Sequence, residues 1–285
     1  MILREPCLPP GWYPRQTGAI EEFLEPFKKA GKSPALTQAP RLSQAAIAPH
    51  AGWYYSGRLA ALAVSSLDAQ AGTVVVIGGH LPEGMPVLSA REDGVKTPLG
   101  AMMIDKELRE AFEKRMPATP DRYQDNTVEV LLPIVRYFFP ESKLLWLRFP
   151  SELSSFEAGR ILAETTADLG RRIVVLSSTD LTHYGRNYGF SPKGTGKLAL
   201  EWVKKSNDAD FINAVLDGEP SMVLKRADED KSACSAGAVL GALGFAAQMG
   251  KKAKLLEYST SADVISSEGD EIPDSFVGYA AISFG

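Results

Sequence analysis

The chain has 285 residues, of which 45% are apolar and 23% are charged, a composition typical of a soluble globular protein. Its formal net charge of −4 comes without a basic block or a stripe of lysine and arginine, which argues against a nucleic-acid partner. No apolar segment is long enough for a signal peptide near the N-terminus or for a membrane span anywhere else. We therefore expect a cytoplasmic protein with no membrane partner.

Strands and helices are predicted to alternate along nearly the whole chain. A proline-rich arm at residues 4–14 precedes a helix that begins near Thr17 and ends at Gly31. Apolar and β-branched runs predict strands at 45–49, 73–77, 86–90, 94–97, 101–104, 143–149, 172–176, 254–258 and 276–284. Helical spacing of apolar residues predicts helices at 58–67, 106–114, 127–138, 154–168, 194–205, 209–216 and 232–249.

Two local signals refine this pattern. Ser56 and Asp105 are suitable caps for the helices that follow them, and 86–90 with 94–97 is expected to form a hairpin. The alternation predicts an α/β fold with a central mixed, largely parallel sheet flanked by helices. Because no repeat or linker is found, residues 1–285 are interpreted as a single domain.

All three histidines of the chain follow predicted strands. His50 comes directly after Pro49, His80 follows Gly78-Gly79, and His183 lies in the loop after the strand at 172–176. In open α/β sheets, ligands bind just outside the carboxyl ends of the strands. A single histidine is more often a structural residue, but three placed in this way predict one shared site.

Cys234 is the most informative residue beside the histidines. It is far from Cys7, the only other cysteine, so no disulfide is expected. The small residues around it predict a position in the first helical turn, which shifts a thiol toward thiolate. Two imidazoles and a thiolate would suit iron, copper or zinc, whereas the plain alternative is a small buried core residue.

Other candidates come from the same loops and from two further segments. Asp180 could orient an imidazole or accept a substrate proton, with His183 as general acid or base, or it could only cap a turn. Glu129 could face a pocket or stabilise the first turn of its helix. Trp53 and Tyr54, with Tyr55, could line an aromatic pocket or belong to the core.

Several ordered segments of the chain match known sequence signatures. The segment Pro49-His50-Ala51-Gly52-Trp53-Tyr54-Tyr55-Ser56-Gly57 resembles the PHAGY-x-YSG signature of the Memo family, also called the AmmeMemoRadiSam system protein B family. Further matches are Gly11-Trp12-Tyr13-Pro14, Thr97-Pro98-Leu99-Gly100, Val128-Glu129-Val130-Leu131-Leu132-Pro133, Ala233-Cys234, Tyr258-Ser259-Thr260-Ser261-Ala262-Asp263 and Val277-Gly278-Tyr279-Ala280-Ala281. The loop Ser177–Gly185 resembles the family's SSDF-x-H-x-G loop with one residue inserted or shifted.

The resemblance implies a fold similar to the class III extradiol dioxygenases, which are non-haem Fe(II) enzymes. It implies that His50, His80 and Cys234 are metal ligands and that His183 and Asp180 take the acid/base position. Trp53, Tyr54, Asn126 and Glu129 are then expected to bind the substrate. Two residues depart from the family pattern, because Asn126 stands where a histidine is usual and Ser235 where a glycine is usual.

Three functional hypotheses follow. The first is an Fe(II)-dependent redox enzyme, with zinc or copper as alternative metals, acting on a small aromatic or otherwise oxygenated substrate. The second is a non-catalytic adaptor that holds a peptide or small ligand in the same pocket, as described for an animal family member. The third is a metal-free hydrolase built on Cys234 and a histidine. The resemblance also implies a functional link to radical SAM and AMMECR-type proteins.

Overall fold

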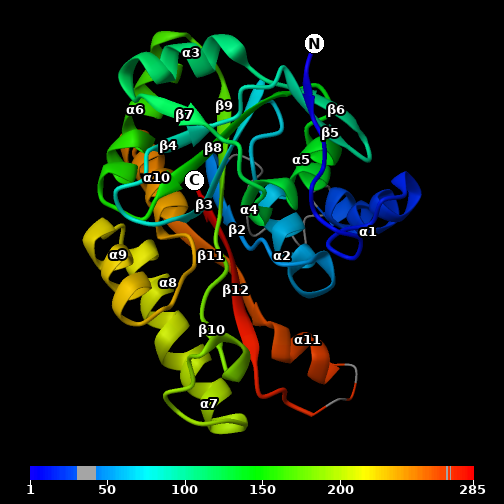
Figure 1. The fold of residues 1–285 in the computed structure, drawn as a ribbon, viewed down its shortest axis with the longest axis vertical. Helices are drawn as coiled ribbons and strands as arrows, with labels where there is room; N and C mark the ends of the chain where they lie inside the picture. Colours follow the sequence, from blue (N-terminus) through cyan, green and yellow to red (C-terminus); the bar gives the residue numbers. More distant parts are fainter. Residues whose placement is uncertain (31–42, 268, 270) are drawn as a thin grey trace.

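A nine-stranded mixed sheet forms the centre of the computed structural model, which describes residues 1–30, 43–267, 269 and 271–285 (Figure 1). The strand order is β10-β12-β2-β9-β3-β8-β4-β7, and β11 also pairs with β12. The strands are β2 (Ala45–Ala48), β3 (Thr73–Leu81), β4 (Val87–Ser89), β7 (Ala118–Pro120), β8 (Lys143–Pro150), β9 (Ile173–Ser178), β10 (His183–Tyr184), β11 (Ala253–Thr260) and β12 (Phe276–Phe284). A separate three-stranded sheet contains β1 (Leu3–Arg4), β5 (Gly94–Thr97) and β6 (Gly100–Met103).

Four neighbouring strands at the middle of the large sheet, β2, β9, β3 and β8, run parallel. Their β-branched and apolar residues are buried on both faces, as expected for strands covered by helices on both sides. Ile47 of β2 and Ile77 of β3 both pair with Ser177 of β9, so the three strands are in register at this row. Their carboxyl ends therefore open at one edge of the sheet.

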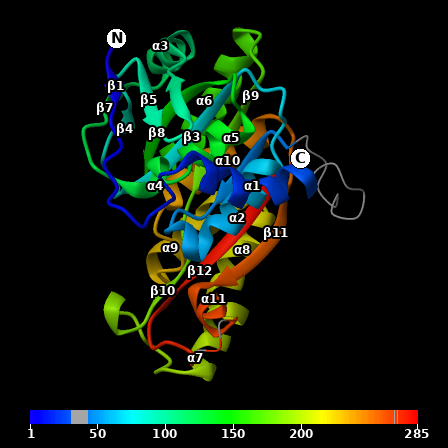
Figure 2. The same ribbon diagram turned by 90° about the vertical axis from the view of Figure 1, so that its right-hand side faces the viewer.

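Helices cover both faces of the sheet. Even-numbered strand residues such as Ala46 and Val76 pack toward α1 (Thr17–Ala30), α2 (Trp53–Ser65) and α5 (Leu132–Phe138), which lie in front of the sheet in Figure 2. Odd-numbered residues such as Ile47 and Val75 pack toward α6 (Ser154–Asp168) and α10 (Ala236–Gln248) on the other face. This alternation is the period of two that a strand imposes on its side chains. The α/β fold with a mixed, largely parallel sheet is thus confirmed.

The remaining helices are short and lie mostly near the ends of the sheet (Figure 1). They are α3 (Lys106–Arg115), α4 (Asn126–Glu129), η1 (Arg186–Tyr188), α7 (Lys197–Trp202), the π-helix η2 (Val203–Asn207), α8 (Asp208–Leu216), α9 (Pro220–Glu229) and α11 (Ser261–Ser267). Within the described residues, no helix is both long enough and apolar enough to cross a lipid bilayer.

Several predicted boundaries were wrong. The expected hairpin of 86–90 and 94–97 does not form, because β4 pairs with β7 and β8 while β5 pairs with β1 and β6. The helix predicted over 127–138 is divided into α4 and α5, with Pro133 in the first turn of α5. The helices α9 and α11 were not predicted. The predicted end of the first helix at Gly31 lies outside the described residues.

Two other helix starts were misplaced. The helix α2 begins at Trp53 with Gly52 as its cap, five residues before the predicted start at Arg58. Ser56 lies inside this helix, and its hydroxyl donates to the carbonyl oxygen of Ala51 at 3.0 Å. The helix α10 begins at Ala236 with Ser235 as its cap. The prediction that Cys234 lies in the first turn of this helix was therefore wrong, because Cys234 lies in the loop before it.

The contact between α6 and α10 depends on glycines, and Gly244→Ala is expected to lower the free energy of unfolding by about 3 kcal/mol or more. A methyl group at Gly244 would collide with the backbone carbonyl of Phe156, so the two helices must separate. Urea unfolding measures the change. Gly18→Ala is the matched control, because a methyl group there meets nothing. Equal stability of Gly244→Ala and the unchanged protein would contradict this packing argument.

Candidate metal centre

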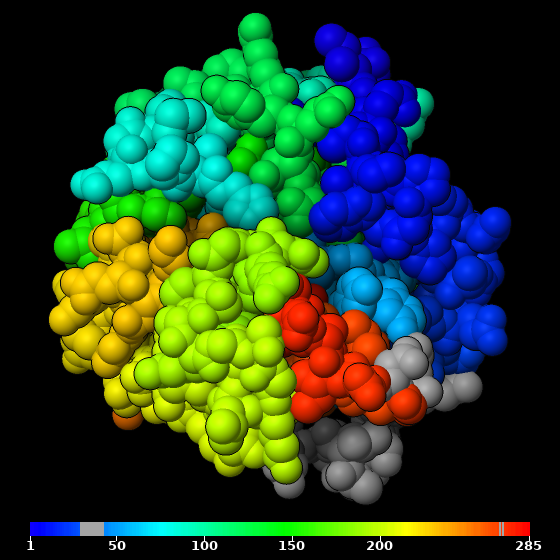
Figure 3. All heavy atoms as spheres, turned by 60° about the horizontal axis from the view of Figure 1, so that its bottom comes forward, coloured from blue at the N-terminus to red at the C-terminus, as the bar shows by residue number. Residues whose placement is uncertain are grey.

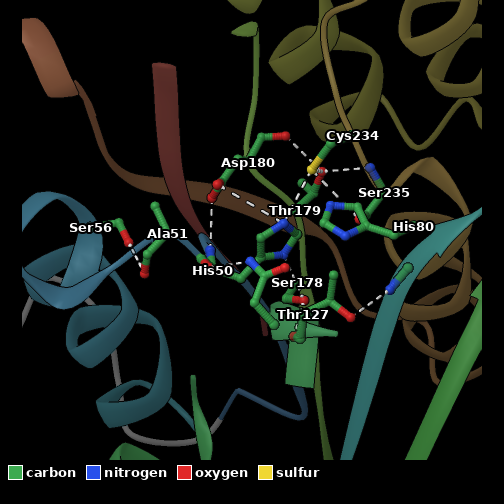
Figure 4. Close-up of polar contacts among 12 residues, drawn as sticks. His50, Ala51, Ser56, His80, Thr127, Ser178, Thr179, Asp180, Cys234 and Ser235 are labelled. Atoms are coloured by element: carbon green, nitrogen blue, oxygen red, sulfur yellow. Dashed lines mark hydrogen bonds and ion pairs between the residues drawn. The ribbon is translucent and has the colours of Figure 1, made fainter. Parts of the chain in front are cut away.

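The three parallel strands β2, β3 and β9 bring residues at or just beyond their carboxyl ends to one place, and His80 lies within the last residues of β3. His50, His80 and Asp180 each come three residues after the row in which Ile47, Ile77 and Ser177 are paired. Cys234 reaches the same place from the loop before α10, and its backbone N–H donates to the carbonyl oxygen of Asp180 at 3.2 Å. Figure 4 shows these side chains pointing toward one another.

His50, His80 and Cys234 together have the geometry of a metal site. One ligand atom of each, an imidazole nitrogen or the Sγ, lies within 4.8 Å of the other two. Sγ of Cys234 is 3.2 Å from Nε2 of His50. Zinc–ligand bonds of roughly 2.0–2.3 Å to nitrogen and sulfur hold two ligand atoms at most about 4.6 Å apart, so an ion would require only a small inward movement of these side chains. Among the described residues, no other group of three histidine, cysteine or acidic side chains is close enough to hold an ion.

The hydrogen bonds around His50 determine which ring nitrogen faces the centre. Nδ1 of His50 lies 3.0 Å from Oγ of Ser178, and that hydroxyl donates its proton to the carbonyl oxygen of Thr127 at 2.5 Å. Because the proton of Ser178 is used in this way, its oxygen accepts from Nδ1–H of His50. Nδ1 of His50 is thus committed to Ser178, so Nε2 is the nitrogen that faces Cys234 and that would bind a metal ion after losing its proton.

His80 is held by a carboxylate. Its Nδ1 lies 3.0 Å from Oδ2 of Asp125, and the guanidinium of the buried Arg148 lies 3.2 Å from the same oxygen. Burial opposes the charge of Asp125, but the bond with His80 and the nearby Arg148 hold the pKa of Asp125 well below its usual range. Asp125 is therefore ionised, and it orients Nε2 of His80 toward the centre as carboxylates do for many metal-binding histidines.

The backbone at His80 is in an unusual conformation. Its φ is +56°, in the left-handed region that non-glycine residues rarely occupy. Gly78 and Gly79 precede it, and a methyl group on either would collide with Thr127 or Ser235. The two glycines thus let neighbouring segments approach closely enough to place His80 beside Cys234. Such local strain tends to be kept where a site requires it.

The charges of the three side chains are coupled. Burial opposes the Cys234 thiolate, but His50 and then His80 lower the pKa of Cys234 well below its ordinary value. Burial likewise opposes the His80 imidazolium, but its bonds with Asp125 and Cys234 raise the pKa of His80 to about 10. Without a metal ion, the centre is thus a thiolate beside at least one imidazolium.

Asp180 and His183 lie beside this centre. Oδ1 of Asp180 accepts from the backbone N–H of His50 at 2.7 Å, and Oδ2 lies 4.0 Å from Nε2 of His50. Burial raises the pKa of Asp180, and the neighbouring His50 opposes this shift. Nδ1 of His183 lies 3.1 Å from the carbonyl oxygen of Leu181, so it carries the proton and leaves Nε2 free.

A cavity of about 450 Å³ adjoins the centre and is lined by His50, His80, Asp180 and His183. Figure 3 shows that the segments around it meet at one end of the molecule, where the yellow-green, red and light-blue parts of the chain come together. The other lining residues are Trp12, Ala51, Gly52, Tyr55, Asn126, Asn187, Tyr188, Ser261, Ile265, Ser275, Val277 and Tyr279.

Of the four expected substrate-binding residues, Asn126 lines the cavity. Its side-chain amide donates to the carbonyl oxygen of His50 at 2.9 Å, so it braces the strand end that carries a candidate ligand. Trp53, Tyr54 and Glu129 are not among the lining residues.

Trp53 and Tyr54 point elsewhere because α2 begins earlier than predicted. Successive helical residues are rotated by about 100°, so Trp53, Tyr54 and Tyr55 face three directions. Trp53 is buried against Phe23, and its indole N–H donates to the carbonyl oxygen of Val130 at 2.9 Å. Tyr54 is 55% exposed. Tyr55 is the one of the three that lines the cavity.

Glu129 is buried, and it anchors the N-terminal arm. Its carboxylate accepts from the backbone N–H groups of Cys7 and Leu8, from the Cys7 thiol and from the Tyr13 hydroxyl, at 2.7–3.1 Å. The arm in turn contributes Trp12 to the cavity wall. This role was not predicted, because the partners are more than 110 positions away in sequence.

Residues that the sequence analysis missed form much of the cavity. Trp12, Tyr188 and Tyr279 line it but come from the arm, a short loop helix and the last strand. Ser178 and Asp125, which set the orientation of the two histidines, were also missed as site residues. A usable signal existed for Ser178 alone, since it lies two residues after the strand predicted at 172–176, and in the structure it ends β9, which pairs with the strand before His50.

Comparisons with known proteins agree over nearly the whole chain. A family profile described as "Memo-like protein" matches residues 4–283. A MEMO1 family protein of Methanosarcina mazei is 31% identical over 290 residues, which cover 99% of each chain. One of Desulfurococcus amylolyticus is 29% identical over 301 residues, covering 100% of this chain and 99% of its own. A solved structure of an uncharacterized Escherichia coli K12 protein has a TM-score of 0.46 and 15% identity, covering 86% of this chain and 100% of its own. This chain therefore belongs to the family of Memo-like proteins.

Proposed function

We propose that the protein is a metal-dependent redox enzyme of the dioxygenase type, acting on a small aromatic or otherwise oxygenated substrate. The observation that carries the proposal is the convergence of His50, His80 and Cys234 beside the cavity, which His50 and His80 line. Their donor set, two imidazoles and one thiolate, suits Fe(II), zinc or copper, and Fe(II) is our choice for redox chemistry. An ion held there would supply open coordination positions for a chelating substrate.

The residues of the chain would hold and orient the substrate. Tyr55, Tyr188 and Trp12 offer aromatic surface to a flat ring, and the cavity is large enough for a single small ring system. His183 faces the cavity with Nδ1 occupied by the carbonyl of Leu181, so Nε2 is the atom that can accept or return a substrate proton. Asp180 interacts electrostatically with both His50 and His183, and it would favour the positive charge that His183 gains.

A non-catalytic role in the same cavity is the alternative. Asn126 replaces a titratable group of the family pattern, and its amide is already committed to the carbonyl of His50. The ligand set also lacks the carboxylate that Fe(II) oxygenases commonly use. Under this alternative, the aromatic wall would hold a peptide side chain or a small ligand without turnover.

The variant His183→Ala distinguishes these roles. It is expected to keep the bound metal yet lower oxygen consumption with an active catechol by about a hundredfold, because it removes only the proton acceptor. Metal content and oxygen uptake are measured on anaerobically loaded protein, with Asn187→Ala as a control in the same cavity. Loss of metal from His183→Ala would make His183 a ligand. If the unchanged protein consumed no oxygen with any of a broad panel of catechols, the binding role would replace the enzymatic one.

A further inference from the structure

The loop that carries His183 is fixed from two sides. On one side lies β12, where the backbone N–H of Leu181 donates to the carbonyl oxygen of Gly278 at 2.8 Å, and the N–H of Gly278 donates to the carbonyl oxygen of Thr182 at 3.0 Å. The carbonyl of Leu181 is in turn the partner of Nδ1 of His183. The peptide groups of 181 and 182 therefore set where the imidazole lies and which nitrogen is protonated.

On the other side lies Asp208, a fully buried carboxylate. Its Oδ1 accepts from both the backbone N–H of Thr182, at 3.0 Å, and the Thr182 hydroxyl, while its Oδ2 accepts from the Tyr258 hydroxyl at 2.7 Å. Asn207 adds a bond from its amide to Oγ1 of Thr182 at 2.8 Å. Burial raises the pKa of Asp208 to about 6, so at pH 7.5 the group is an ionised acceptor for all three donors.

Two further features of the fold make the contact between Asp208 and Thr182 possible. The helix that contains Asp208 is interrupted just before it by the π-helix Val203–Asn207, which rotates the residues that follow relative to an unbroken α-helix. Asn207 and Asp208 thus both face Thr182. Gly278 is the second feature, because any side chain there would collide with Oδ2 of Asp208. The carboxylate fits only because β12 has a glycine at this position.

We propose that Asp208 is a positioning residue, which holds the loop through Thr182 so that His183 stands in one orientation and one tautomer at the cavity. The inference rests on the proposed function for what His183 does there. The orientation and the tautomer of the His183 imidazole can be tested without any measurement of turnover. Removing the carboxylate would leave the buried N–H and hydroxyl of Thr182 without their acceptor, and the loop would rearrange to satisfy them.

The chain offers a direct readout, because it has only three histidines. Each has a different partner at Nδ1, namely Ser178, Asp125 or the carbonyl of Leu181. Histidine side-chain nitrogen NMR on the metal-free protein at pH 7.5 therefore reports separately which nitrogens of each ring carry a proton. The test variants are Asp208→Asn and the isosteric Thr182→Val, which removes the hydroxyl with little change of shape. The matched control is Tyr258→Phe, which removes a partner of Asp208 but leaves both bonds to Thr182.

In Asp208→Asn and Thr182→Val, His183 is expected to lose its single-tautomer pattern while the signals of His50 and His80 keep their positions. Tyr258→Phe is expected to leave all three patterns unchanged although it also lowers stability. An unchanged His183 in the test variants, a joint shift of all three histidines, or an equal shift of His183 in Tyr258→Phe would overturn the proposal. If Asp208→Asn does not fold, Thr182→Val decides alone. Absence of oxygen consumption would count against the proposed function and not against this result.

Discussion

Cys234→Ala is expected to lower the affinity for Fe(II) or Zn(II) by about two to three orders of magnitude while the metal-free fold survives. Structural zinc sites with four ligands bind with roughly 10–16 kcal/mol, or about 2.5–4 kcal/mol for each ligand. Cys234 is the one thiolate of the three candidate ligands, so the loss falls at the upper end of that range. The side chain is small and only half-buried, so its removal is expected to reduce stability by about 1 kcal/mol.

Cys7→Ala is the matched control, because it removes the other cysteine. Burial and the bond to Glu129 raise the pKa of Cys7 to about 11, so its thiol stays protonated near neutral pH. Metal content by elemental analysis is expected to be normal in Cys7→Ala and lost in Cys234→Ala. A retained metal in Cys234→Ala would exclude Cys234 as a ligand.

Alkylation tells a ligand from a nucleophile. The Cys234 thiolate is expected to react readily in the metal-free protein, and saturating metal is expected to suppress the reaction, since the sulfur would then be coordinated. Suppression should disappear in His50→Ala and His80→Ala. Equal rates with and without metal would instead favour a metal-free site, in which the 3.2 Å contact of Cys234 with His50 serves a thiolate nucleophile.

The centre of the site was predictable because it depends on strand register. Parallel strands end at the same edge, so residues at equal distance beyond the paired row of β2, β3 and β9 had to meet there. The runs that form these strands are unambiguous in the sequence. His50 and His80 follow from this rule alone, whereas Cys234 was assigned by the chemistry of its side chain and by the family resemblance.

The helix starts were not predictable from local signals. Neither Gly52, which precedes α2, nor Ser235, which precedes α10, makes a side-chain capping bond. Ser56 has the residue type of a cap, but it lies inside a helix that began earlier. With the helix predicted to begin at Arg58, Trp53 and Tyr54 were expected in a loop beside the pocket. In the structure they belong to α2, and the side of the helix on which each residue lies determines what it faces.

The supporting residues were hidden for a different reason. Asp208 stands in a polar stretch and Glu129 in the first turn of a predicted helix, where an acidic residue is common without any partner. Their partners are distant in sequence, as with Tyr258, which lies 50 positions from Asp208. Only the packed structure shows that they are buried and fully bonded. Sequence patterns predict strands and helices, whereas the roles of Glu129 and Asp208 depend on contacts between side chains that are far apart in the sequence.

Metal affinity is expected to rise by about tenfold for each pH unit between pH 6 and pH 9, a total of about a thousandfold. The metal ion requires the lone pair on Nε2 of His80, but the pKa of His80 is raised to about 10 when no metal is bound. A proton must therefore leave with each ion, and the cost of removing it falls as the pH approaches 10. His50 and His80 lower the pKa of the Cys234 thiol well below its ordinary value, so Cys234 contributes less to this slope than an ordinary thiol would.

Calorimetric titration of the metal-free protein with Zn(II), in buffers of different ionisation enthalpy, measures the protons released. At least one proton per ion is expected at pH 7.5, and more if His50, whose pKa is also raised, is charged as well. His183→Ala is the matched control, because it removes a cavity histidine outside the ligand group and should keep the same slope. An affinity that did not change with pH, or binding without proton release, would show that His80 is not protonated beside Asp125 or does not bind the ion.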